Sequence, residues 1–310
     1  MTEVPKFLPG KVGQISSNKI EWNEFMVCMA PTLKNRIKLH STARKLAEYP
    51  VCLIDECDLS DNKTYKISIN TGLYNCFVKI GLSGSALMNE DKNKNEAIRG
   101  YFGDKLYEIK NRQLMDEGYS SEVVIKIVTG NLDLMEGESY DTQYHQGIIE
   151  NKLRNKKVFK RVKRAIKKGR LPALIIVKNH KHIELLYSLF KRLCPKNISV
   201  DWVHHKRKDR YKIVRRFTEG KLDVLIGSLI LKRGKNFPLM RFIINAGGGK
   251  GVENTLQILG RATRFHESKK RTYYEDFYDE GLYIRRHSKR RIIAYKNEQL
   301  KVTELYKKDY

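Results

Sequence analysis

Short apolar runs alternate with amphipathic segments along most of the chain. In the first half, this pattern predicts strands at 25–30, 51–56 and 76–82 and helices at 33–48 and 91–102. In the second half, it predicts strands at 173–177, 198–203, 223–228, 241–246 and 273–278, and helices at 181–193, 209–219, 254–263 and 283–298. Strands and helices that alternate in this way are typical of βαβ units. We therefore predict an α/β fold with parallel sheets that helices cover on both faces.

A basic segment lies between the two halves. Residues 152–170 include eleven lysines and arginines and no acidic residue, while Val158, Val162 and Ile166 recur every four residues. This spacing predicts a basic amphipathic helix, which either contacts phosphates or presents a solvated charged face. We accordingly expect a first domain over 1–125, a linker and basic helix over 126–170, and a second domain over 171–310.

Charge favours a polyanionic partner. The 310 residues contain 61 lysines and arginines against 35 acidic residues, a net charge of +26, in a chain that is 41% hydrophobic. Such a balance is typical of a globular protein that binds nucleic acid, and the alternative is a basic protein without that partner. No apolar stretch approaches the roughly 18 residues of a membrane span, and residues 1–11 lack the apolar core of a signal peptide. We expect a cytoplasmic protein. Its five cysteines, without a CxxC pair, argue against a zinc ribbon.

Three carboxylates follow the predicted strand at 51–56. They belong to Asp55, Glu56 and Asp58. Ligands of open α/β sheets bind at the carboxyl ends of the strands. Neighbouring carboxylates suit a divalent cation, one holding Mg²⁺ while another orients a water molecule. An ordinary acidic turn is the alternative.

A second candidate site is the segment 257–264, with the sequence QILGRATR. On a helix, Arg261 and Arg264 would share a face, and Gln257 would lie one turn before Arg261. Gly260 would allow another backbone to approach closely. Guanidinium groups meet phosphate oxygens in pairs, so the segment predicts a phosphate-binding helix, with an ordinary surface helix as the alternative.

These motifs together resemble those of superfamily 2 helicases and translocases, in particular the UvsW-like and XPB-like branch. Residues 55–58 (DECD) resemble motif II, and residues 81–86 (GLSGSA) resemble motif III. Residues 173–177 resemble motif IV, 210–238 the run into and through motif V, and 257–264 the QxxGRxxR of motif VI. Residues 26–33 resemble, more weakly, the segment that contacts the nucleic-acid backbone. The resemblance implies two RecA-like domains.

The resemblance also implies a role for each matching residue. Asp55 would coordinate the Mg²⁺ of bound ATP, Glu56 would polarise the attacking water, and Arg261 and Arg264 would act on the γ-phosphate. Ser83 and Ser85 would couple the nucleotide state to domain closure. The remaining matches would bind the nucleotide (Gln257, Gly234 and Asn236) or the nucleic acid (Thr32, Ser228 and Lys250). Many relatives have aspartate where this chain has Asn236, so one charge is lost there.

One motif of the family is not found. The phosphate-binding loop of such motors has the Walker A pattern GxxxxGK[ST], and none of the Gly-Lys pairs of this chain fits it. Residues 247–251 (GGGKG) are interpreted as a loop after a strand. In relatives the Walker A loop precedes motif II by roughly a hundred residues, so we expect the first RecA-like domain to be N-terminally incomplete and the second complete. An incomplete sheet would expose a strand edge and an apolar face, and we expect a separate polypeptide with a Walker A segment to cover them.

The sequence therefore predicts an ATP-dependent DNA helicase or translocase, the C-terminal portion of a split or truncated motor that uses ATP and Mg²⁺. Its partner would be single-stranded or branched DNA, with RNA as an alternative and no membrane. By analogy with the UvsW-like branch, it would act in recombination and repair in a phage or microbe. The first alternative is a catalytically inactive nucleic-acid-binding remnant. A nuclease using Asp55, Glu56 and Asp58 would leave the paired arginines without a role.

Overall fold

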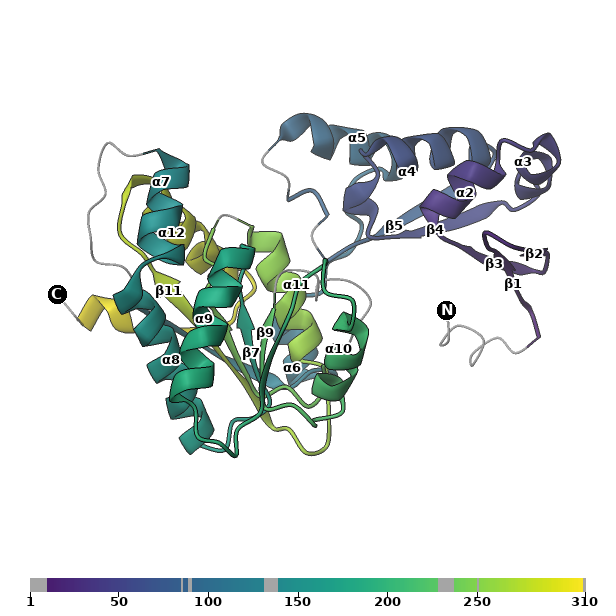
Figure 1. The fold of residues 1–310 in the computed structure, drawn as a ribbon. Coiled ribbons are helices and arrows are strands. Elements are labelled where there is room, and N and C mark those ends of the chain that lie inside the picture. The colour runs from purple at the N-terminus through teal and green to yellow at the C-terminus, as the bar shows by residue number, and fades with distance from the viewer. Residues whose placement is uncertain are drawn as a thin grey trace. The chain divides into compact units, whose positions relative to one another are not determined.

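The chain divides into two compact units, residues 1–107 and 108–310. The computed structural model describes residues 10–84, 86–88, 91–130, 139–227, 237–249 and 251–308 (Figure 1). Within this described part, no helix has the length and apolar character needed to cross a bilayer.

The first unit contains two small sheets. Its elements are β1 (Val12–Ile15), β2 (Ile20–Glu21), β3 (Phe25–Cys28), α2 (Ala30–Arg36), α3 (His40–Leu46), β4 (Val51–Asp55), α4 (Lys63–Ile67), β5 (Val78–Leu82) and α5 (Lys92–Phe102). Strand β1 pairs with β2 antiparallel and with β3 parallel, while β4 and β5 form a separate parallel pair. The predicted helix over 33–48 is instead two helices, because Leu39 has an extended backbone.

The second unit is built on one seven-stranded parallel sheet with the order β12-β6-β11-β10-β7-β9-β8. Its strands are β6 (Glu122–Thr129), β7 (Ala173–Ile176), β8 (Val200–Val203), β9 (Val224–Gly227), β10 (Phe242–Asn245), β11 (Arg271–Tyr278) and β12 (Lys301–Glu304). Its α-helices are α6 (Asn111–Asp116), α7 (Tyr140–Tyr144), α8 (Lys152–Lys167), α9 (His180–Leu193), α10 (Arg210–Thr218), α11 (Val252–Ala262) and α12 (Leu282–Asn297).

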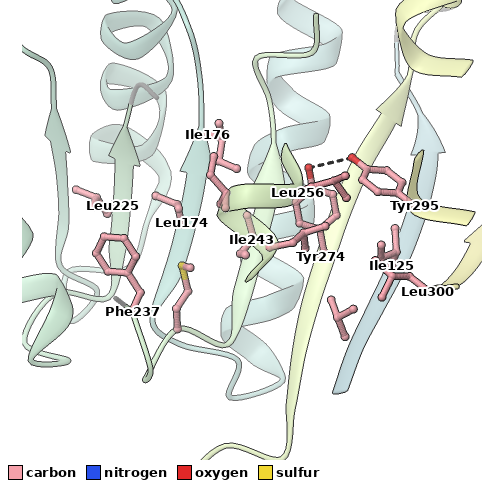
Figure 2. Packing of buried hydrophobic residues seen from close by; sticks show 14 of the residues in the cluster. Ile125, Leu174, Ile176, Leu225, Phe237, Ile243, Leu256, Tyr274, Tyr295 and Leu300 are labelled. Carbon is pink, nitrogen blue, oxygen red and sulfur yellow. Dashed lines mark hydrogen bonds between the residues drawn. The ribbon is translucent and has the colours of Figure 1, made fainter. Parts of the chain in front are cut away.

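Helices cover both faces of this sheet. On one face, α8 and α9 pack against alternate strand residues such as Ile175 and Ile226. On the other face, α10, α11 and α12 pack against the remaining residues of the same strands. Figure 2 shows Leu256 of α11 and Tyr295 of α12 beside Tyr274 of β11, where the Tyr295 and Tyr274 hydroxyl groups are hydrogen-bonded at 3.2 Å. The predicted α/β class with a parallel sheet is confirmed.

Strand β6 differs most from the prediction. The expected linker over 126–170 contains the second half of this strand, all eight residues of which pair with β11, from Glu122–Arg271 to Thr129–Tyr278. Its other edge pairs with β12, near the end of the chain. Ile125 and Ile127 are fully buried. Because partners about 150 and 175 residues away complete this strand, the local apolar pattern gave no sign of its place in the sheet.

Candidate functional site

The acidic segment lies where β4 ends. Asp55 is the last residue of β4 and pairs in register with Leu82, the last residue of β5. Glu56 has a left-handed backbone (φ 54°), and its N–H donates to Asp55 Oδ1 at 2.9 Å. Non-glycine residues adopt this conformation at a cost and often at functional sites. The turn leaves Asp55 exposed and Glu56 partly exposed at the carboxyl end of a parallel pair.

A hydrogen bond joins the acidic segment to the residues after β5. Ser83 Oγ donates to Asp58 Oδ1 at 2.7 Å. Two segments 25 residues apart, which the sequence analysis assigned to motifs II and III, are therefore in direct contact. Ser85, the second predicted coupling residue, lies outside the described residues.

Close packing beneath this turn requires glycine at position 81. A Cβ on Gly81 would lie 2.9 Å from Cys57 Sγ and 3.0 Å from Phe102 Cγ. Cys57 is 2% exposed, and burial, followed by the neighbouring Asp58 charge, raises the pKa of its thiol to about 11. The thiol is therefore neutral at physiological pH and has a packing role, because only the thiolate is a strong nucleophile.

The donor set at the end of β4 suits Mg²⁺ only when phosphates share it. Among the described residues, no group of three histidine, cysteine or acidic side chains converges as a metal site. Mg²⁺ commonly binds through one or two carboxylates together with substrate phosphates and water. Asp55 would hold the ion in this way, and the bound ion would neutralise charge on the phosphates.

The segment 257–264 is only partly helical. Gln257 is half-buried on α11, which also contains Arg261, whose side chain is outside the described part. The prediction that Arg261 and Arg264 share a helical face is wrong, because α11 ends at Ala262 and Arg264 instead forms an antiparallel bridge with Ser120.

Backbone pairing draws the chain away from the helix axis at this point. The Ser121 N–H donates to the Thr263 carbonyl at 2.5 Å. Arg264 is exposed. The expected close approach at Gly260 is not seen either, since no described atom lies within 4 Å of the place where a Cβ would stand.

Several predicted site residues cannot be placed. Ser228, Gly234, Asn236 and Lys250 lie outside the described residues. Thr32, predicted to contact nucleic acid, is half-buried on α2.

Two buried arginines that are not among the predicted site residues hold the glycine-rich loop after β10. Arg154 of α8 forms a bidentate pair with Asp279 (2.7 and 3.1 Å) and donates to the Ala246 carbonyl at 2.6 Å. Arg291 of α12 forms a bidentate pair with Asp276 (2.7 and 3.1 Å) and donates to the Gly249 carbonyl at 2.6 Å. All four side chains are at most 1% exposed.

This loop leads directly into α11. Gly247, within it, would place a Cβ 3.0 Å from the backbone of Val177, so the loop also packs closely on the end of β7. The two arginines therefore hold the backbone of the loop that precedes the helix with Gln257 and Arg261. In the sequence, Arg154 lies in the basic segment 152–170, and Arg291 lies in a second basic run at 285–291. Their buried carboxylate partners distinguish them from surface charges.

Comparison with known proteins agrees with this arrangement. Residues 157–266 match the family model of the helicase conserved C-terminal domain. The chain as a whole is similar to superfamily 2 helicases, and its fold resembles that of RecA-like helicase domains in solved structures.

Individual relatives cover the chain to different extents. It is 25% identical over 230 residues to the ATP-dependent DNA helicase uvsW of Enterobacteria phage T4, which covers 72% of this chain and 44% of that protein. It is 27% identical over 97 residues to the ATP-dependent RNA helicase dbp4 of Schizosaccharomyces pombe, or 31% of this chain and 13% of that protein. A structure of Dbp5 from S. cerevisiae bound to RNA and ADP BeF3 has a TM-score of 0.58 at 14% identity, over 96% of this chain and 70% of that one. The chain spans less than half the length of the curated relatives it matches.

Proposed function

We propose that this chain is part of an ATP-driven motor that moves along or unwinds DNA. The observation that carries the proposal is the hydrogen bond from Ser83 to Asp58, because it links the acidic turn at β4 to the turn after β5. Asp55 holds Mg²⁺ with the nucleotide phosphates, and Glu56 orients the attacking water. Ser83 and Ser85 transmit the state of the nucleotide.

The second unit contributes positive charge and nucleic-acid contacts in this proposal. Arg261 and Arg264 stabilise negative charge on the γ-phosphate, where a single arginine is worth orders of magnitude in rate. Gln257, Gly234 and Asn236 contact the nucleotide. The nucleic-acid strand is bound by Thr32 in the first unit and by Ser228 and Lys250 in the second.

DNA is preferred over RNA as the substrate because of the lengths of the alignments. The phage T4 DNA helicase aligns over 72% of the chain, whereas the fission-yeast RNA helicase aligns over 31%. Branched DNA in recombination and repair, with a phage or microbial source, extends the same proposal.

The phosphate-binding loop comes, in this proposal, from residues outside these 310. An uncovered apolar face of the β4–β5 pair supports this view. Alternate residues of both strands are exposed, including Leu53 at 63% and Leu82 at 49%, together with Val51, Val78 and Ile80. Parallel strands are normally buried on both faces. A segment carrying a Walker A loop, which the sequence analysis places on a separate polypeptide, would cover this face.

The test is ATP hydrolysis by the 310-residue chain, measured with and without single-stranded DNA or RNA. Glu56→Gln is compared with Glu48→Gln, an exposed glutamate of the same unit. We expect no turnover by the chain alone, and DNA-stimulated turnover after addition of a Walker A segment, lost in Glu56→Gln only. Turnover by the chain alone would contradict the need for an added loop. If the Walker A segment is added and ATP is still not hydrolysed, the result would favour the alternative, a catalytically inactive nucleic-acid-binding protein.

A further inference from the structure

A basic pocket lies on the face of the second unit's sheet that α8 and α9 cover. Its volume is about 430 Å³. The pocket is lined by side chains from α8, from the ends of β6 and β11, and from the turn after β12: Val128, Thr129, Lys157, Lys160, Arg161, Arg164, Phe277 and Leu305. Four of the eight residues are basic and none is acidic, so the pocket suits an anion.

The four basic residues form one stripe along α8. Lys157, Lys160, Arg161 and Arg164 stand at spacings of three, four and seven residues, which places them on one side of an α-helix. At 1.5 Å per residue, the stripe is about 10 Å long. Lys156 and Lys163 of the same helix are exposed but do not line the pocket.

Two residues of the stripe are held by the sheet. Lys157 Nζ donates to the Gly130 carbonyl at 2.9 Å. Arg161 forms a bidentate pair with Glu275 of β11, at 2.5 and 2.7 Å, and this carboxylate is 7% exposed. These contacts hold the stripe against the sheet. They also leave Glu275, the acidic residue beside the pocket, paired with Arg161.

The other two residues keep their charges without a counter-ion. Lys160 and Arg164 are exposed, and no carboxylate of the described chain pairs with either of them. Arg164 and then Arg170 lower the pKa of Lys168, the residue that follows α8, because like charges repel at this end of the stripe. A bound anion would relieve this repulsion.

We propose that the stripe of Lys157, Lys160, Arg161 and Arg164 binds the phosphate backbone of a single nucleic-acid strand. This surface is distinct from α11, which packs on the opposite face of the sheet. A stripe of four cations over about 10 Å exceeds the size of one phosphate group and matches a chain of phosphates. Backbone contacts of this kind do not depend on base sequence. The proposal goes beyond the motor site, and strand binding here requires no ATP.

The experiment measures the affinity for a labelled dT oligonucleotide of about 30 nucleotides, without ATP, over a range of salt of about 50–200 mM. The test variant is Lys160→Gln/Arg164→Gln, and the matched control is Lys156→Gln/Lys163→Gln, which removes the same charge from the same helix. Each lost phosphate contact lowers the salt slope of log K by about 0.7 for a single strand. We expect the test variant to bind at least several-fold more weakly, with a slope about 1.4 smaller.

A further variant and a competition experiment distinguish strand binding at this surface from the alternative explanations. The charge-conserving Lys160→Arg/Arg164→Lys should retain both affinity and slope. Binding is measured without ATP, so failure of the motor proposal leaves this one standing. Equal losses in the test and control variants would overturn the proposal, because they would show a general charge effect. Displacement of the strand by inorganic phosphate at constant ionic strength would overturn it in favour of a single-anion pocket.

Discussion

Replacing Arg291 with methionine should destabilise the second unit strongly. The guanidinium group is 1% exposed and makes four hydrogen bonds, two to Asp276 and one each to the carbonyls of Gly249 and Phe277. Methionine can fill much of the space but donates none of them. After the substitution, the donors left to the buried Asp276 carboxylate among the described residues are the Tyr295 hydroxyl and the Phe277 N–H, both at 2.7 Å.

The expected loss follows from the burial of both partners. Breaking a buried ion pair by removing one side typically costs about 3–5 kcal/mol, because the other charge remains without compensation. Native domains are stable by only about 5–15 kcal/mol. With a urea slope of about 2 kcal/mol/M, a loss of about 4 kcal/mol lowers the unfolding midpoint by about 2 M.

Tryptophan fluorescence can follow the second unit separately. The chain has two tryptophans, Trp22 in the first unit and Trp202 in the second. In a Trp22→Phe background, urea unfolding followed through Trp202 reports on the sheet that Arg291 supports. Arg286→Met, an exposed arginine on the same helix, is the control and should change stability by less than about 0.5 kcal/mol.

A double-mutant cycle tests the cause. Because both partners are in contact, Arg291→Met combined with Asp276→Asn should cost less than the sum of the single changes, by about 1–3 kcal/mol. A loss below about 1 kcal/mol for Arg291→Met would refute the reasoning. Additive costs in the cycle would show that the carboxylate is not the group left uncompensated.

Three other predictions concern packing, pH and coupling. Gly81→Ala should lower the melting temperature of the first unit, at a cost of about 1–3 kcal/mol, because the new Cβ meets Cys57; Gly100→Ala on α5, where a Cβ meets nothing within 4 Å, should raise stability by about 0.5–1 kcal/mol. Burial, and secondarily Arg154, lowers the pKa of His182 from 6.5 to about 3. The unfolded chain therefore binds a proton that the folded chain does not, and stability should fall by about 1.4 kcal/mol per unit as pH drops below 6.5 toward 3, less so in His182→Gln. Ser83→Ala removes the bond to Asp58 and should reduce DNA stimulation of ATP hydrolysis by about 2- to 10-fold in the complemented motor.

Each of these predictions has a contrary outcome. Equal changes in melting temperature for Gly81→Ala and Gly100→Ala would mean that the close contacts beneath the acidic turn do not limit the stability of the first unit. A His182→Gln variant with an unchanged slope of stability against pH would assign acid sensitivity to other groups. Normal stimulation in Ser83→Ala would mean that the bond to Asp58 is structural alone.

Much of the local structure could be predicted from the sequence. Strands β7, β9 and β10 and helices α9, α10 and α12 begin and end within one or two residues of the predicted positions. Each is a continuous apolar run or an amphipathic repeat, which depends only on neighbouring residues. Asparagine caps add to this local signal, since Asn151 and Asn179 accept backbone N–H groups at the starts of α8 and α9. The acidic segment at Asp55 could also be predicted, because it directly follows a continuous apolar run.

Features that depend on contacts between distant segments could be known only from the tertiary structure. Sheet pairing places β6 between β11 and β12, although the local pattern predicts the end of one domain and a linker over these residues. The bridge to Ser120 ended α11 before Arg264, where the helical repeat predicted continuation. Burial opposite carboxylates distinguishes Arg154 and Arg291 from the other arginines and lysines near them in the sequence. A hydrophobic or charge pattern reflects only residues that are neighbours along the sequence. The energy of a buried charge or of a strand inserted into a sheet depends on distant partners, which only folding brings together.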